Sequence, residues 1–344
     1  MTIAAPVRFA RPLAAAFGAC ALLLLSGCHD DANKGSRTAS SGTTSSSSGS
    51  GGQTQLAFVT NNPSDYWKIC NSGASAAQKK LGDVNLQFVE PGDNSAAAQK
   101  QDVNDLLTKG VKGIAISPSD PANETDFLNT VASKTNLITS DSDAPNTNRL
   151  CYIGTDNHAA GVMAGGLIKQ ALPQGGKIML FVGSKDAQNA HDRIAGIEEA
   201  LKGSNVTVSD VRTDNADHTV AKNNAADAIV AHPDVVGMVG IWSYNGPAIY
   251  SAVKSAGKQG KIQIIAFDQE TDTMTGIKDG TIYGAVVQQP YQFGYQAITL
   301  LDQLAKGDKS GIPASKQIII PTQAIKKDNI DAYLTSQAKL LGGA

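Results

Sequence analysis

Short apolar runs alternate with helical patterns along most of this chain, and that alternation limits the folds it can adopt. From Gln55 onward the runs recur at about the spacing of βα units, in two successive series. The predicted strands are Leu56–Thr60, Leu86–Val89, Gly113–Ser117, Leu137–Ser140 and Cys151–Ile153, then Lys177–Val182, Val206–Val211, Val235–Ile241, Ile262–Phe267 and Ile282–Gln288. Helical patterns between them include Ala96–Lys109, Ala159–Leu172, Thr219–Ala231 and Phe293–Lys306.

These runs are apolar on both faces, as parallel strands covered by helices on each side require. The sequence therefore predicts an α/β protein with two doubly wound parallel-sheet lobes. A length of 344 residues agrees with two domains. Ligands bind at the carboxyl ends of the strands in such sheets, so two facing lobes would place those ends around one cleft.

Composition excludes several other classes of protein. With 41% hydrophobic residues the chain is not disordered, and its 29 Lys+Arg against 31 Asp+Glu give no long-range field for binding nucleic acid. The 4 cysteines form no CxxC pair, which excludes a zinc ribbon or an iron–sulfur site. Cys70 and Cys151 could pair in an oxidising compartment, although we expect two free, packed thiols.

The N-terminus has the pattern of a secretory signal, with Arg8 and Arg11 before an apolar run over 13–25 that is too short for a permanent membrane span. The sequence Leu-Ser-Gly-Cys that ends at Cys28 resembles the lipobox of bacterial lipoproteins. That resemblance implies that the signal peptide 1–27 is removed and that Cys28 is lipidated. The alternative is that cleavage falls elsewhere and this cysteine is incidental.

The segment 28–54 is rich in Ser and Gly and has no apolar periodicity, so it predicts a flexible tether between the lipid and the folded part. We therefore expect a periplasmic protein that is lipid-anchored to a membrane. His29, rather than Asp, follows the lipobox cysteine, which favours the outer membrane over the inner one.

Polar and aromatic side chains come directly after the predicted strands. In the first series they are Asn61-Asn62-Pro63, Ser117-Pro118-Ser119-Asp120 and Asp141-Ser142-Asp143; in the second they are Gly183-Ser184, Trp242-Ser243-Tyr244-Asn245, Asp268-Gln269 and Gln288-Gln289-Pro290. Carboxylates and amides pair with vicinal hydroxyl groups, and aromatic faces cover the C–H side of a sugar ring. The set contains no lysine and so predicts a neutral ligand with many hydroxyl groups.

Several short motifs recur in order and resemble those of the ribose-type periplasmic sugar-binding proteins of ABC importers. They lie at Phe58–Pro63, Gly113–Asp120, Ile153–Gly161, Ala231–Val235, Ala266–Asp268 and Val287–Pro290. The resemblance covers Gln55 to the C-terminus and implies the type I periplasmic-binding fold, in which two lobes joined by three crossings close over a monosaccharide. The same fold forms the effector domain of lactose-repressor-type regulators, but here a secretion signal stands where their DNA-binding helices would be.

With this fold we expect an N-terminal lobe of residues 55–155 plus 289–319 and a C-terminal lobe of residues 156–288 plus 320–344. The resemblance also implies a ligand site. Its predicted members are Asn62, Tyr66, Trp67, Ser117, Asp141, Ser142, His191, Arg193, Tyr244, Asn245, Asp268 and Gln288. Among them the family's paired carboxylates match Asp141 and Asp268, and the amide of its last crossing matches Gln288.

This chain departs from the ribose receptors at two positions. Ser142 stands where they have an arginine after the first carboxylate, and their second-lobe arginine aligns with His191, although Arg193 is two residues on. The segment around Tyr244 and Asn245 is bulkier than usual, and its Trp242 could belong either to the core or to the cleft wall. We therefore expect the cleft to take a sugar of the ribose-like class, which need not be ribose itself.

Other interpretations of the same residues are weaker. Asp141 and Asp268 could be a glycosidase acid–base pair, and Asp141-x-Asp143 resembles a metal-binding DxD motif that lacks a third ligand. Gly161, Gly165 and Gly166 do not form a dinucleotide-binding motif, so we interpret them as allowing close helix packing. We expect no catalytic residue, no metal and no cofactor.

The expected function is a monomeric receptor that captures a monosaccharide, a pentose or a hexose, and delivers it to the transmembrane subunits of an ABC permease. Nucleic acid is not an expected partner, and the membrane is contacted through the lipid anchor. Two other classes stay open: a sugar-sensing receptor that docks on a chemoreceptor or sensor kinase, and a secreted sugar-processing enzyme, which would turn over the bound sugar.

Overall fold

The computed structural model describes residues 52–92 and 95–342. The predicted signal peptide, the lipidation site Cys28 and nearly all of the predicted tether lie outside the described residues. Within the described ranges, no helix has both the length and the apolar character needed to span a membrane.

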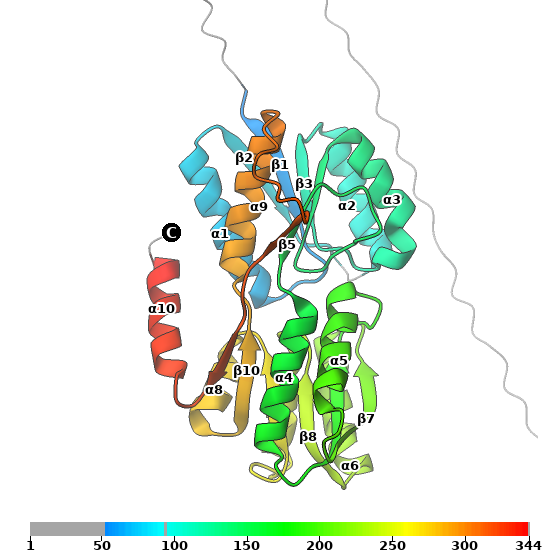
Figure 1. Ribbon diagram of the computed structural model, residues 1–344, viewed down its shortest axis with the longest axis vertical. Coiled ribbons are helices and arrows are strands. Elements are labelled where there is room, and N and C mark those ends of the chain that lie inside the picture. Colours follow the sequence, from blue (N-terminus) through cyan, green and yellow to red (C-terminus); the bar gives the residue numbers. More distant parts are fainter. Residues whose placement is uncertain (1–51, 93–94, 343–344) are drawn as a thin grey trace, which may run out of the picture. The chain divides into compact units, whose positions relative to one another are not determined.

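Two six-stranded sheets organise the chain (Figure 1). The first contains β1 (Thr54–Val59), β2 (Val84–Val89), β3 (Gly113–Ile116), β4 (Asn136–Ser140), β5 (Tyr152–Gly154) and β11 (Gln317–Ile319). The second contains β6 (Gly176–Val182), β7 (Val206–Thr213), β8 (Val235–Gly240), β9 (Gln263–Phe267), β10 (Ile282–Val287) and β12 (Gln323–Lys326). Their strand orders are β11-β5-β4-β3-β1-β2 and β12-β10-β9-β8-β6-β7, and each predicted strand overlaps an observed one.

Neighbouring strands are parallel throughout both sheets, except that β12 runs antiparallel to β10. The chain passes between the sheets after β5, after β10 and again between β11 and β12. The predicted α/β class with two parallel-sheet lobes is therefore confirmed.

Helices cover both faces of each sheet, which explains why the strands are apolar on both sides. The first sheet is covered by α1 (Asp65–Leu81), α2 (Ala96–Thr108), α3 (Pro121–Lys134) and α9 (Pro290–Ala305). The second is covered by α4 (Asn157–Ala171), α5 (Gln188–Leu201), α6 (His218–Ala231), α7 (Asn245–Ser255), α8 (Thr271–Asp279) and α10 (Ile330–Gly342). As a result every residue of β3 and β5 is buried.

Small residues let one helix pair in each lobe pack very closely. In the second lobe α4 lies against α5 (Figure 1), and a Cβ added at Gly161 would lie 2.2 Å from the carbonyl oxygen of Arg193. In the first lobe a Cβ at Gly73 of α1 would lie 1.9 Å from the carbonyl oxygen of Tyr291 on α9. Gly165 also meets α5, whereas Gly166 faces open space, so its predicted packing role is wrong.

The Gly161→Ala substitution should lower the free energy of unfolding by about 1–3 kcal/mol, because the new methyl group forces α4 and α5 apart. Gly166→Ala on the same helix is the matched control, since nothing lies within 4 Å of its added Cβ. It should be neutral or stabilise by up to about 1 kcal/mol through helix propensity. Thermal unfolding of both variants measures the difference, and equal midpoints would contradict the close packing.

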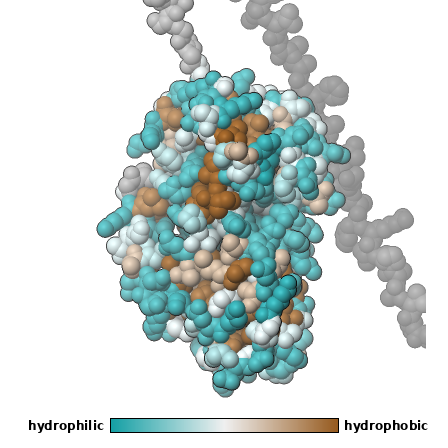
Figure 2. Space-filling model, viewed as in Figure 1, coloured by the Kyte–Doolittle hydropathy of each residue, from teal (hydrophilic) through white to brown (hydrophobic). Residues whose placement is uncertain are grey.

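The surface in Figure 2 is mostly hydrophilic, with a group of hydrophobic residues near its middle, over the region of β5 and β11 in Figure 1. Ile319 at the end of β11 is 46% exposed, and Ile318 beside it is half-buried. This short edge strand therefore carries apolar side chains close to the point where the chain crosses from β11 to β12.

Candidate functional site

A polar pocket lies where the carboxyl ends of strands from both sheets meet. Its empty space, part of which is open to solvent, amounts to about 300 Å³. Its lining is Asn61, Asn62, Ser64, Tyr66, Trp67, Asp141, Asn189, Arg193, Trp242, Ser243, Tyr244, Asp268 and Gln288. Apart from the pair on α5, these residues follow β1, β4, β8, β9 and β10 or lie in the first turn of α1.

Asp141 and Asp268 occupy equivalent places in the two lobes. Each directly follows an inner strand, and each has a positive φ of 64°. The backbone N–H of Asp141 donates to the carbonyl of Ile153, and that of Asp268 donates to the carbonyl of Val286, each on the neighbouring strand. Asp tolerates this left-handed conformation better than most residues, and such strained positions are concentrated at functional sites.

Three side chains hold the carboxylate of Asp141. The hydroxyl of Tyr66 donates to Oδ1 at 2.9 Å, and Oδ2 accepts from Oγ of Ser117 at 3.0 Å and from Nδ2 of Asn189 at 3.1 Å. Because Asn189 belongs to α5, the last of these bonds joins the two lobes directly inside the pocket.

Asp268 is held by Gln288 at the crossing that follows β10. Nε2 of Gln288 lies 3.1 Å from Oδ1 and 3.3 Å from Oδ2 of Asp268, and Oε1 of Gln288 accepts from the hydroxyl of Thr155 at 2.9 Å. Thr155 lies at the first crossing, just after β5. This amide therefore connects the second-lobe carboxylate to two of the three hinge crossings.

Arg193 is 1% exposed and, among the described residues, is the only cationic side chain in the lining of this pocket. Its Nε donates to Oδ1 of Asn157 at 2.9 Å, Nη1 donates to the carbonyl of Ile241 at 2.8 Å, and the guanidinium lies 4.5 Å from the ring centre of Phe267. Asn157 in turn directs Nδ2 toward the carbonyl of Asp141, 3.3 Å away. The guanidinium is thus fixed while its Nη2 stays without a partner among the described residues.

The two carboxylates ionise less readily than exposed ones. Burial raises the pKa of Asp268 to about 6, and the charge of Arg193 opposes that shift. Burial also raises the pKa of Asp141, against the opposing effects of Arg193 and of the hydrogen bonds from Tyr66, Ser117 and Asn189. Keeping both groups charged at neutral pH therefore depends on the single arginine and on hydrogen-bond donors.

Four buried polar atoms of the pocket lack a hydrogen-bond partner within the described part of the chain. They are Oδ1 of Asn62, Oδ1 of Asn189, Nη2 of Arg193 and Nε1 of Trp242. Two are acceptors and two are donors, and buried polar groups are almost always paired. A ligand whose groups both donate and accept, as hydroxyl groups do, matches this set.

Eight of the predicted site residues line the pocket: Asn62, Tyr66, Trp67, Asp141, Arg193, Tyr244, Asp268 and Gln288. Ser117 and Asn245 lie behind the residues that line the pocket. The hydroxyl of Ser117 donates to Asp141. Asn245 accepts from the backbone N–H of Trp242 and donates to the carboxylate of Asp214. Ser142 is also buried outside the lining, since the left-handed turn at Asp141 carries the chain away from the pocket.

The structure corrects the prediction for His191. Asn189 and Arg193 are four residues apart on α5 and share one helix face, whereas residue 191 lies on the opposite face. The side chain of His191 is 71% exposed and faces Asp192. Arg193 is therefore the arginine of the second lobe at this pocket.

Five residues that line the pocket are not among the predicted site residues: Asn61, Ser64, Asn189, Trp242 and Ser243. Asn61, Trp242 and Ser243 follow strands, so the strand-end rule already pointed to them. Asn189 could have been found only from its spacing to Arg193 on one helix.

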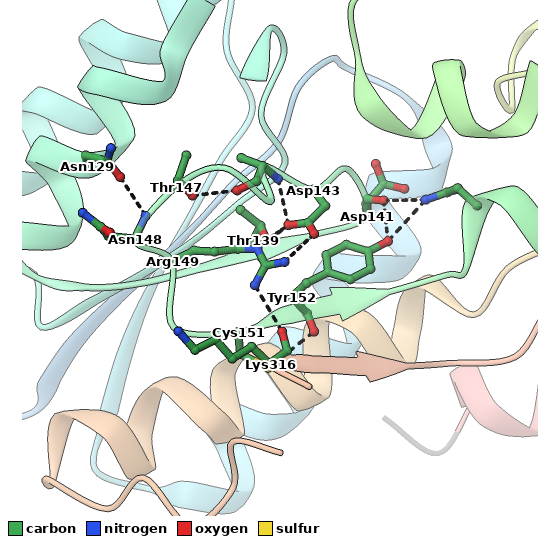
Figure 3. Close-up of polar contacts among 12 residues, drawn as sticks. Asn129, Thr139, Asp141, Asp143, Thr147, Asn148, Arg149, Cys151, Tyr152 and Lys316 are labelled. Carbon is green, nitrogen blue, oxygen red and sulfur yellow. Dashed lines mark hydrogen bonds and ion pairs between the residues drawn. The ribbon is translucent and has the colours of Figure 1, made fainter. Parts of the chain in front are cut away.

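The DxD motif splits into two separate environments, as Figure 3 shows. Asp143 turns to the guanidinium of Arg149 and accepts from the hydroxyl of Thr139, while the hydroxyl of Tyr152 donates to the backbone carbonyl of Asp141. Across the described ranges, no group of three or more His, Cys, Asp or Glu side chains could hold a metal ion. Cys70 and Cys151 are both buried and free.

Two α/β lobes with a polar pocket between their strand ends define the class of two-lobed solute-binding proteins. A family model described as the periplasmic binding protein domain matches residues 56–309, and the chain belongs to this family. Membership implies a periplasmic or other extracytoplasmic location, and it makes the chain a binding protein rather than an enzyme.

Relatives agree with this assignment. The ribose import binding protein of Salmonella typhimurium is 27% identical over 254 residues, which are 72% of this chain and 83% of that protein. An ABC transporter solute-binding protein of Burkholderia graminis, solved in complex with D-arabinose, has a TM-score of 0.77 and 30% identity over 82% of this chain and 98% of its own. A glucose-galactose binding protein from Geobacillus stearothermophilus has a TM-score of 0.75 and 26% identity, over 80% of this chain and 98% of its own. The predicted resemblance to ribose-type sugar-binding proteins is confirmed.

Proposed function

We propose that this protein captures a neutral monosaccharide, a pentose or a hexose, between its lobes and delivers it to an ABC-type sugar permease. The unpaired donors and acceptors around Asp141 and Asp268 carry the proposal, since hydroxyl groups can satisfy all four. The sugars that the relatives bind, which include ribose, arabinose, glucose and galactose, support the same class.

Capture proceeds by hinge closure. The first lobe contributes Asn62, Tyr66, Trp67 and Asp141, and the second contributes Arg193, Tyr244 and Asp268. A sugar that contacts both sets stabilises the closed arrangement over the open one, and the permease recognises the lobe rims held together. In this proposal the two lobes are residues 55–155 plus 289–319 and residues 156–288 plus 320–344, and the receptor works as a monomer.

A thermal-shift screen of the purified protein tests this function. The panel contains D-ribose, D-arabinose, D-xylose, D-allose, D-glucose and D-galactose, with D-galacturonate as the matched anionic control. A sugar at about 100 times its dissociation constant adds roughly 2.7 kcal/mol, which raises the midpoint by several degrees. We expect a shift with one or a few neutral sugars and none with the control; flat curves throughout, or a sugar recovered chemically altered, would contradict the proposal.

The anchor is a separate proposal: Cys28 is diacylated, residues 1–27 are removed, and the lipid holds the receptor to the outer membrane through the 28–54 tether. Each buried acyl methylene contributes about 0.8 kcal/mol, so two or three chains give stable attachment. Cys28→Ser should release the protein into the soluble periplasmic fraction, with Cys70→Ser as the control that stays bound. Membrane attachment of both variants would contradict lipidation at this cysteine.

A further inference from the structure

Asp214 is a buried carboxylate that the ligand pocket does not use directly. It follows β7, the edge strand of the second sheet (Figure 1), and is 2% exposed. Its Oδ1 accepts from the hydroxyl of Tyr244 and from the backbone N–H of Ala216, and its Oδ2 accepts from Nδ2 of Asn245 at 2.8 Å. Asp214 faces the neighbouring hollow, which also has Asn61 and Trp242 in its lining.

These bonds tie Asp214 directly to Tyr244 and, through Asn245, to the backbone of Trp242; we call these two aromatic residues the aromatic wall. The two rings meet edge to face, with centres 6.4 Å apart, and both line the ligand pocket. Oδ1 of Asn245 accepts from the backbone N–H of Trp242 at 3.0 Å, so Asn245 links Asp214 to the backbone of the tryptophan by two hydrogen bonds. On its other side Tyr244 stacks on His218, with ring centres 4.4 Å apart.

The backbone of Gly183 packs tightly against both residues of the aromatic wall and restricts their positions. A Cβ added there would lie 2.0 Å from Cζ3 of Trp242 and 2.6 Å from the hydroxyl of Tyr244. The φ of Gly183 is not in the left-handed region, so glycine is required here because there is no room for a side chain and not because of the backbone conformation. The indole thus has no room to move toward Gly183, while Asn245 fixes the backbone of Trp242 and Asp214 fixes the hydroxyl of Tyr244.

We propose that Asp214 is a positioning residue: it fixes the aromatic wall and thereby determines which sugars the pocket accepts. This inference rests on the proposed function. Because the Tyr244 hydroxyl is committed to Asp214, the wall offers the ligand two ring surfaces and one donor, Nε1 of Trp242. A wall of this kind selects by the shape of the C–H face of a sugar and by one acceptor oxygen.

The network needs a carboxylate and not merely a polar group. In Asp214→Asn the new amide directs its NH2 group either at Nδ2 of Asn245 or at the Tyr244 hydroxyl and the backbone N–H of Ala216. The hydroxyl can accept, but Nδ2 of Asn245 and the Ala216 N–H can only donate, so either orientation places two donors against each other. Asn245 has no alternative orientation, since its Oδ1 is used by Trp242. The substitution therefore breaks either the link through Asn245 to Trp242 or the Ala216 bond that holds residue 214 in place, while it keeps the shape of the side chain.

The test uses the whole chain labelled with 5-fluorotryptophan. It has 2 tryptophans, Trp67 in the first lobe and Trp242 in the wall, so fluorine NMR gives one resonance from each. We expect Asp214→Asn to shift or broaden the Trp242 resonance and to leave that of Trp67 in place. Asp210→Asn on the same strand is the control, because its carboxylate is largely exposed and pairs with Arg212.

Isothermal titration then compares D-ribose, D-arabinose, D-xylose and D-galactose on the same variants. We expect the ratio of the dissociation constants of the two best sugars to change at least fivefold in Asp214→Asn and not in Asp210→Asn. An unchanged ratio and an unchanged Trp242 resonance would overturn the inference. If Asp214→Asn does not fold, Tyr244→Phe removes the same hydrogen bond and should move the Trp242 resonance. If no sugar binds the unaltered chain, the proposed function fails, while the fluorine spectra still decide whether Asp214 holds the wall.

Discussion

Arg193→Met should weaken sugar binding at least 100-fold, which corresponds to about 2.7 kcal/mol. The variant loses the unpaired Nη2 donor of the pocket, and it also loses the charge that opposes the raised pKa values of Asp141 and Asp268. Removing one partner from a buried charge cluster costs about 3–5 kcal/mol, so the free energy of unfolding should fall as well. Isothermal titration and denaturant unfolding measure the two effects.

Arg212→Met is the matched control, because Arg212 lies on β7 and pairs with Asp210 at the surface. It should change neither the affinity nor, by more than about 1 kcal/mol, the stability. Sugar binding by Arg193→Met within threefold of the unaltered protein would remove this arginine from the site, whatever its effect on stability.

Asp268→Asn should stabilise the empty protein and weaken its binding of sugar. The ordinary pKa of 3.8 applies to the unfolded chain, and burial raises it to about 6 in the folded one. Between those values the unfolded chain loses its proton first, so rising pH favours unfolding. The cost is absent below about pH 4 and complete above pH 6, where a shift of about two pKa units amounts to about 3 kcal/mol.

The variant and the unaltered protein should therefore have similar stability near pH 3.5, and the variant should be more stable at pH 7. Affinity should fall about 100-fold at pH 7, since hydrogen bonds to a charged acceptor contribute about 1.5–3 kcal/mol each. Asp234→Asn is the control, because the pKa of this exposed carboxylate is lowered by Lys177 and its neutralisation should not stabilise the fold. A variant that binds normally, or one with no gain in stability above pH 6, would refute the assigned role of Asp268.

The fold could be predicted from the sequence because its strands are buried on both faces. Runs such as Gly113–Ser117 contain no charged residue, and the structure shows why: helices lie on each side of β3. Strands β11 and β12 gave no comparable signal, since they are short, partly exposed edge strands close to a crossing. Their pairing is fixed by the two lobes and not by their own composition.

The candidate site could be predicted where its residues follow strands and not where they lie on a helix. Asp141, Asp268 and Gln288 come directly after β4, β9 and β10, so the topology alone gathers them. Choosing between His191 and Arg193 required the rotation of α5 about its axis, which depends on the packing of Gly161 against that helix. Sequence spacing determines which residues share a helix face, but it does not say which face is turned to the ligand.

Asn157 hydrogen-bonds both to a residue of the pocket lining and to residues of the hinge. Its carbonyl oxygen Oδ1 receives Nε of Arg193, and its Nδ2 reaches back to Asp141 and to the Tyr152 hydroxyl, on the other side of the first crossing. The first crossing between the lobes is therefore stiffened by the same side chain that orients the guanidinium in the pocket lining. Because Asn157 contributes both to the hinge and to the position of the guanidinium, a substitution that loosens the hinge should also displace Arg193.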